Sequence, residues 1–180
     1  EILSEDGSYV PLNGNQTGYI LVNYILEGRK TAGTLPSNGA MVKSIVTSTL
    51  TTDIAESYGV KMYEALTGFK NIAEVILHNE GKGIYVCGGE ESFGFAVGEY
   101  VRDKDSPITV SLICECAAWC KDRNTTVWGL LQSIYKQFGK RKDWLRSYTF
   151  PGIEGKKKID SLVETFRTNP PTHIAGSRII

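Results

Sequence analysis

The order of apolar and polar residues predicts alternating strands and helices over most of the chain. Short β-branched runs predict buried strands, and apolar residues every three or four positions predict amphipathic helices. Strands are expected in "AMVKSIVTSTL", "VKMYEAL" and "IYVCGG", and helices in "TGYILVNYILEGRKTAG", "TTDIAESYG" and "NIAEVILHNEGKG". The first of these helices should run for about four turns and end at Gly33. This alternation indicates βα units around a largely parallel sheet.

The pattern changes near Gly139, after two more expected helices in "ITVSLICECAAWCKD" and "TTVWGLLQSIYKQFG". "KRKDWLRSYTF" is strand-like, "PGIEGKKKIDSLVETFRTNPP" is a charged helix stopped by prolines, and "THIAGSRII" begins another strand. We therefore expect an α/β domain over 1–139, with a mostly parallel mixed sheet flanked by helices. Residues 140–180 should form a linker and a βαβ segment of a next domain. The chain opens on elements already under way, so we expect a piece of a longer protein.

The charges balance, with 20 Lys and Arg against 20 Asp and Glu in 180 residues. No overall field then favours nucleic acid or an anionic membrane, so we expect neither as a partner. No apolar run approaches the roughly 20 residues that span a bilayer, and the first ten residues do not resemble a signal peptide. These features favour a cytoplasmic protein with a small or local partner.

The four cysteines could pack in a core, form disulfides or bind metal. Cys116 and Cys120 share a helical face at positions i and i+4, while Cys114 points elsewhere. No CxxC motif accompanies them, and the two histidines stand alone. We favour core packing and expect no metal site in these residues.

Three loops leave the expected strand ends, where α/β sheets bind their ligands: 47–52, 66–70 and 88–94. In an extended "GGEESFG" loop, Glu90 and Ser92 would point together at a ligand and Glu91 would point back into the protein. A carboxylate beside a hydroxyl suits sugar hydroxyls, and the glycines allow close backbone approach. An acidic hairpin turn is the open alternative. No Ser-His-Asp set, HExxH, P-loop or GxGxxG is present.

The ordered motifs resemble a known family. "GGEESFGF", preceded by "LTGFKNIAEVI" and followed by "YVRDKD", resembles the third domain of the α-D-phosphohexomutases, the phosphoglucomutase and phosphomannomutase superfamily. "LNGNQTGYILVNYIL", "KSIVTSTLTTDIAESYGVKMYEALTGFK" and "FRTNPPTHIAGSRII" extend the resemblance over almost the whole chain. They favour the phosphoglucomutase-2-like or phosphopentomutase-like branch.

The resemblance implies a four-domain enzyme that interconverts hexose 1-phosphate and hexose 6-phosphate. A phosphoserine gives its phosphoryl group to glucose or mannose phosphate, and a sugar bisphosphate is both intermediate and activator. The third domain recognises the sugar in two orientations. The substrate-binding residues that the resemblance implies are Glu90 and Ser92 for ring hydroxyls, Thr67 and Gly68 as a second specificity loop, Lys104, and Lys43 near the active site.

The chain also departs from the family pattern. The serine loop, the three-aspartate Mg²⁺ loop and the phosphate-binding loop of the other domains do not occur in it, so we expect no catalytic residue here and no activity of these residues alone. Mg²⁺ and the other domains of the same chain would complete the site. Two alternatives remain open: a phosphopentomutase of the same branch, and a non-catalytic sugar-phosphate-binding module.

Overall fold

The computed structural model describes residues 1–144 and 146–179, which divide into two units. The first unit comprises Glu1–Lys142 and the second Asp143–Ile180. The assignment of 1–139 and 140–180 to a third and a fourth domain stays a prediction.

A four-stranded sheet lies at the centre of the first unit, in the order β4-β3-β5-β6. The strands are β3 (Gly39–Ser44), β4 (Lys61–Ala65), β5 (Ile84–Gly89) and β6 (Phe95–Val97). The first three are parallel, and β6 returns antiparallel to β5. All six residues of β3 are buried, as expected for a central strand covered on both faces. The predicted mixed, mostly parallel sheet flanked by helices is confirmed.

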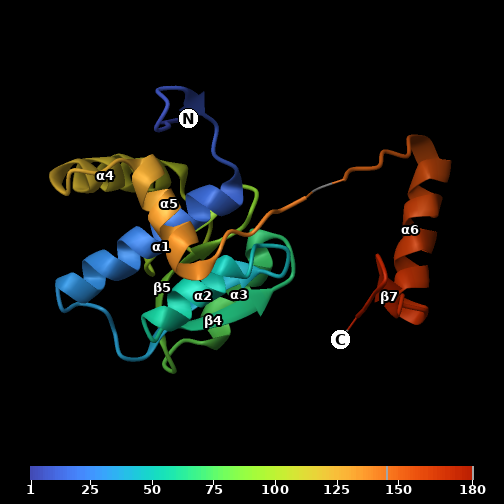
Figure 1. The fold of residues 1–180 in the computed structure, drawn as a ribbon. Helices are drawn as coiled ribbons and strands as arrows, with labels where there is room; N and C mark the ends of the chain where they lie inside the picture. The colour runs from blue at the N-terminus through green and yellow to red at the C-terminus, as the bar shows by residue number, and fades with distance from the viewer. Residues whose placement is uncertain (145, 180) are drawn as a thin grey trace. The chain divides into compact units, whose positions relative to one another are not determined.

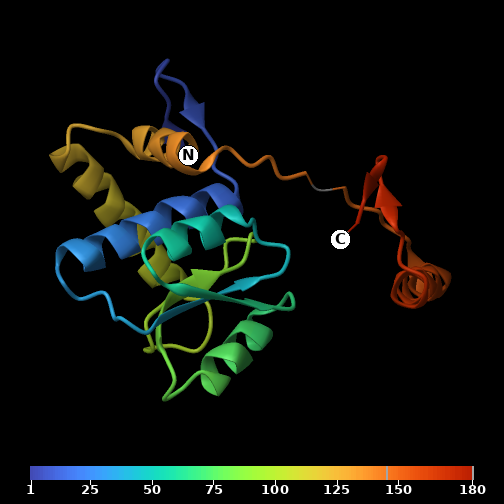
Figure 2. The ribbon, with the colours of Figure 1, turned by 60° about the horizontal axis from the view of Figure 1, so that its bottom comes forward.

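Helices cover both faces of this sheet (Figures 1 and 2). One face carries α1 (Gly14–Thr31) and α2 (Leu50–Ser57), and the other carries α3 (Phe69–His78). Two more helices, α4 (Ser106–Asp122) and α5 (Val127–Phe138), pack against α1. A short hairpin of β1 (Ile2–Leu3) and β2 (Tyr9–Val10) precedes them.

The helix α1 is longer than predicted, with 18 residues. It starts at Gly14 because Asn13 forms a capping box with Gln16: the Asn13 Oδ1 accepts from the Gln16 N–H at 2.8 Å, and the Gln16 Oε1 accepts from the Asn13 N–H at 2.9 Å. The start of α1 lies close to the strand ends, since Gly14 is next to the Glu91 backbone just after β5.

Two apolar cores lie on opposite faces of the sheet. Cys87, Cys116 and Cys120 are fully buried in the larger core, so the predicted core packing is confirmed for these three, whereas it is wrong for Cys114, which is exposed. Burial raises the pKa of the Cys87 thiol to about 12. No helix in the described ranges is long and apolar enough to cross a membrane.

The second unit contains α6 (Gly152–Thr168) and a hairpin of β7 (His173–Ile174) and β8 (Ser177–Arg178). The helix is as predicted. The prediction of a strand in the segment before it is wrong, because residues 140–144 and 146–150 form no strand. The described residues thus give a helix and a hairpin in place of the expected βαβ segment. Aromatic residues alone do not make a strand, because a strand also needs a hydrogen-bonded neighbour.

Candidate functional site

The three predicted loops meet at the carboxyl edge of the parallel strands, because β3, β4 and β5 all run in the same direction. The stretch 88–94 comprises the last two residues of β5 and the connection of the β5–β6 hairpin, in which the Glu90 N–H donates to the Gly94 carbonyl at 2.7 Å. Its backbone is therefore the turn that the sequence left open as an alternative. Its carboxylates are not simply solvated, however, since both accept hydrogen bonds from neighbouring loops.

Glu90 links the hairpin to the loop after β4. Its Oε1 accepts from the Gly68 N–H at 2.7 Å, on the side of the sheet that α3 covers. Gly68 has φ +105°, a conformation that side chains rarely adopt, so glycine suits this position. A carboxylate has about four acceptor sites, and the Gly68 N–H occupies one of them. The two loops that the resemblance assigns to sugar recognition are thus held together by Glu90.

Lys104 lies on the same side of the hairpin. Its Nζ is 5.6 Å from the centre of the Phe69 ring and 3.4 Å from the Asp103 Oδ1. A Cβ at Gly94 would lie 3.0 Å from the Glu90 Oε2 and 3.3 Å from the Lys104 Cδ. The absence of a side chain at Gly94 therefore leaves room for an acidic and a basic group beside each other.

Glu91 reaches the other way. Its Oε2 accepts from the Ser44 Oγ at 2.9 Å and from the Thr47 Oγ1 at 3.3 Å, at the end of β3. This matches the predicted inward direction of Glu91. Ser92 and Thr67 are exposed at the same edge.

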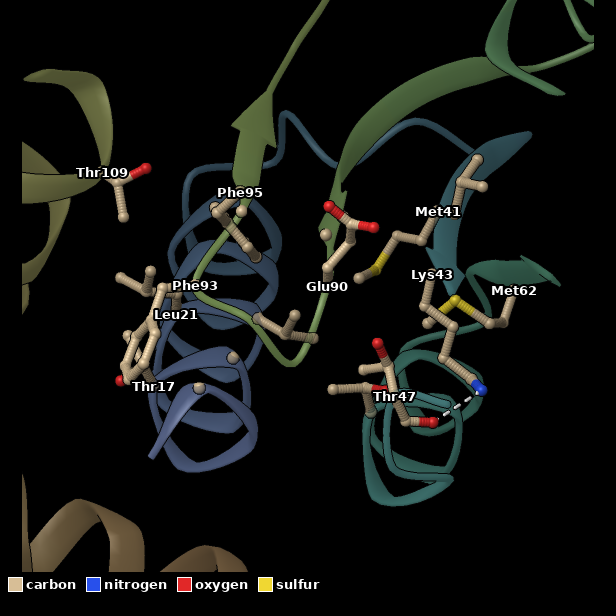
Figure 3. Close-up of a pocket in the computed structure, with 18 residues that line it drawn as sticks. Thr17, Leu21, Met41, Lys43, Thr47, Met62, Glu90, Phe93, Phe95 and Thr109 are labelled. Atoms are coloured by element: carbon tan, nitrogen blue, oxygen red, sulfur yellow. Dashed lines mark hydrogen bonds between the residues drawn. The ribbon is translucent and has the colours of Figure 1, made fainter. Parts of the chain in front are cut away.

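Lys43 is almost fully buried in β3. Its Nζ pairs with the Glu64 Oε1 at 2.7 Å and donates to the Thr47 carbonyl at 3.0 Å, a bond drawn in Figure 3. Two of the three donors of the ammonium group are therefore used by the protein. The structure places Lys43 beside Thr47, and within the described part of the chain it makes no hydrogen bond or ion pair with Glu90, Gly68 or Lys104.

A small pocket, with a cavity volume of about 30 Å³, lies between α1, β3 and the hairpin (Figure 3). Its polar side chains include those of Glu90, Lys43 and Thr47, and its apolar walls include Leu21 and Met41. Of the predicted residues, only Glu90 and Lys43 line it. The described residues contain no group of three or more His, Cys, Asp or Glu that could hold a metal ion, so they do not fit the implied Mg²⁺.

Sequence reasoning missed the residues that hold the hairpin in place. Besides Ser44 and Thr47, the start of α1 contributes: a Cβ at Gly14 would overlap the Glu91 carbonyl, and the Asn15 Oδ1 accepts from the Ser48 N–H at 3.1 Å. The capping sequence "NGNQ" marks where α1 begins. No periodicity shows that this helix end touches a loop more than 70 positions away.

Three comparisons with known proteins agree with this arrangement. Residues 13–138 match the model of phosphoglucomutase/phosphomannomutase, alpha/beta/alpha domain III. Phosphoglucomutase of Staphylococcus aureus strain N315 is 39% identical over 173 residues, which are 96% of this chain and 31% of that protein, and its MSSA476 counterpart is 38% identical. The chain therefore spans about a third of the length of these relatives.

Two solved structures are similar. Parafusin from Paramecium, named as a phosphoglucomutase and solved in an open form, has a TM-score of 0.54 at 26% identity, covering 74% of this chain and 22% of that one. A Thermus thermophilus structure that carries the name phosphomannomutase has a TM-score of 0.53 at 22% identity, covering 67% and 25%, and supports the fold alone. With the family model matching well over half of the residues, the chain belongs to the phosphoglucomutase/phosphomannomutase family, as its α/β/α domain III.

Proposed function

We propose that this chain is the sugar-recognition domain of an enzyme that interconverts hexose 1-phosphate and hexose 6-phosphate in the cytoplasm. One observation carries the proposal: Glu90 stands where the β5–β6 hairpin, the Gly68 loop and Lys104 come together at the strand ends. The carboxylate keeps free acceptor sites there, and a cation is close by.

The chemistry of this group suits a sugar phosphate. A carboxylate accepts hydrogen bonds from ring hydroxyls, the exposed hydroxyls of Ser92 and Thr67 both donate and accept, and the Lys104 ammonium attracts a phosphate. One acceptor beside one hydroxyl serves two sugar orientations, since neighbouring ring hydroxyls exchange places when the sugar turns over. We assign the phosphoserine, Mg²⁺ and the sugar bisphosphate of the reaction to other parts of the complete protein.

The test is Glu90→Gln in the complete protein, with glucose 1-phosphate as substrate. The change keeps shape and still accepts from Gly68, but it weakens a charge-assisted bond to a hydroxyl, so kcat/KM should fall about ten- to a hundredfold. Glu99→Gln, at an exposed turn position after β6, is the matched control and should behave as wild type.

Wild-type kcat/KM of Glu90→Gln would refute the sugar-binding assignment. The same assay with ribose 1-phosphate addresses the pentose alternative: a higher kcat/KM than with glucose 1-phosphate would make this a phosphopentomutase domain. No turnover of either substrate by the wild-type protein would favour a binding module.

A further inference from the structure

Glu91 forms a small hydrogen-bonded group with two hydroxyls at the end of β3, which we call the Glu91 network: Glu91, Ser44 and Thr47. The Ser44 Oγ lies 2.9 Å from the Glu91 Oε2 and 2.8 Å from the Thr47 Oγ1, and the Thr47 Oγ1 lies 3.3 Å from the same carboxylate oxygen. Two hydroxyl protons serve these three contacts. The shortest arrangement has Thr47 donating to Ser44 and Ser44 donating to Glu91.

The side of the network opposite the hairpin is firmly held. Ser44 and Thr47 are buried, and the Lys43 Nζ donates to the Thr47 carbonyl at 3.0 Å. The next residue, Ser48, donates its backbone N–H to the buried Asn15 side chain of α1 at 3.1 Å. Glu91 thus binds to a segment that cannot shift without breaking several buried hydrogen bonds, each costly to leave unpaired.

Glu91 directly follows Glu90 in the chain, so the two residues share one peptide unit. The Glu91 carboxylate is bound at the end of β3, by the hydroxyls of Ser44 and Thr47, and the Glu90 carboxylate is bound at Gly68, the residue before α3. Holding Glu91 at Ser44 therefore fixes the peptide unit next to Glu90, and with it the direction in which the Glu90 side chain leaves the hairpin.

We propose that Glu91 is a positioning residue for sugar recognition, acting through Glu90 and not by contact with the substrate. The proposal rests on the proposed function of Glu90 and adds to it the residue that orients this carboxylate. A misdirected Glu90 weakens the bond to a ring hydroxyl, and this loss appears in substrate binding.

The experiment is a double-mutant cycle in the complete protein with glucose 1-phosphate. Glu91→Ala removes the network and should raise KM about five- to tenfold with kcat nearly unchanged, the result expected when the substrate and the transition state lose the same binding energy. Added to Glu90→Gln, it should cost nothing further, because the group it orients is already weakened. Glu91→Gln retains an oxygen that accepts from Ser44, so it should stay within about twofold of wild type.

Ser44→Ala gives an independent measurement if Glu91→Ala fails to fold, since it removes the middle hydroxyl and leaves the hairpin sequence intact. It should raise KM in the same direction. Glu99→Ala, an exposed glutamate after β6, is the control for loss of a carboxylate and should leave both constants unchanged.

The outcomes separate this inference from the proposed function. If Glu90→Gln loses activity while Glu91→Ala and Ser44→Ala keep the wild-type KM, the positioning role is wrong and the proposed function stands. The positioning role is also overturned if the effects of Glu90→Gln and Glu91→Ala on KM are fully additive in the double variant. It is overturned as well if Glu91→Ala lowers only kcat, in proportion to the loss of folded protein. Wild-type activity of Glu90→Gln overturns the proposed function, and this inference with it.

Discussion

Gly14→Ala should displace the sugar loop without removing any polar group. A Cβ at Gly14 would overlap the Glu91 carbonyl oxygen, and it would lie 2.5 Å from the Glu91 carbonyl carbon and 3.0 Å from the Phe93 nitrogen. These are backbone atoms, so no flexible side chain can rotate away. Non-bonded carbon atoms prefer about 3.5 Å or more, so the hairpin must retreat by about 1 Å.

A retreat of this size moves Glu90 relative to its substrate. A displacement of about 1 Å at a positioned group can lower kcat/KM by about a hundredfold. Overpacking costs about 1–3 kcal/mol of stability, and replacing glycine in a helix returns about 0.5–1 kcal/mol. We therefore expect a large loss of kcat/KM for glucose 1-phosphate and a fall in melting temperature of only a few degrees.

Gly28→Ala is the matched control in the same helix. A Cβ at Gly28 meets nothing within 4 Å, so this variant should keep its kcat/KM and gain about 0.5–1 kcal/mol of stability. The assays are steady-state kinetics and thermal unfolding of the complete protein. If Gly14→Ala has wild-type kinetics and the same melting temperature as Gly28→Ala, the contact between α1 and the hairpin does not position the site.

Three further predictions follow from burial. Lys43→Met replaces a buried ammonium group by an apolar side chain of similar length. The melting temperature of this variant should stay within about 4 °C of wild type while kcat/KM falls. A large loss of stability with normal kinetics would show that Lys43 has a purely structural role. Cys114 is exposed and Cys87 buried, so alkylation followed by mass spectrometry should label the first in the native protein and the second only after unfolding. Burial raises the thiol pKa of Cys87 and Cys116 from 9.0 to about 12, so the native state keeps protons that the unfolded state releases. Their contribution to stability is present below pH 9 and is lost as pH rises toward 12, and a melting temperature that stays constant over this range would contradict it.

Periodicity predicted the parts of the fold in which local pattern and burial agree. The β3 and β5 runs are β-branched or apolar because both faces of these strands are covered, and α3 shows a clear apolar stripe. The strand β6 was missed, since three residues become a strand only by pairing with β5. The segment 140–150 was wrong for the converse reason: its pattern resembles a strand, and its described residues have no strand partner.

The candidate site was predictable as far as strand direction determines it. The strand-end rule brings the loops of Glu90 and Gly68 to one edge, and the structure joins them by a hydrogen bond. Ser44 could not be found this way, because it is the last residue of a buried strand and looks like part of the core. Gly14 and Asn15 belong to a helix start, and their approach to the hairpin is a tertiary contact that no local pattern records.

The adjacency of Glu90 and Glu91 restricts how the length of this hairpin can change in evolution. Each carboxylate is bound by a different segment, Glu90 at Gly68 after β4 and Glu91 at Ser44 at the end of β3. Glu90 directly follows Gly89, the last residue of β5, so a residue inserted there would move both carboxylates away from their partners. Insertions in relatives should therefore fall in the turn beyond Ser92 wherever both hydrogen bonds are kept.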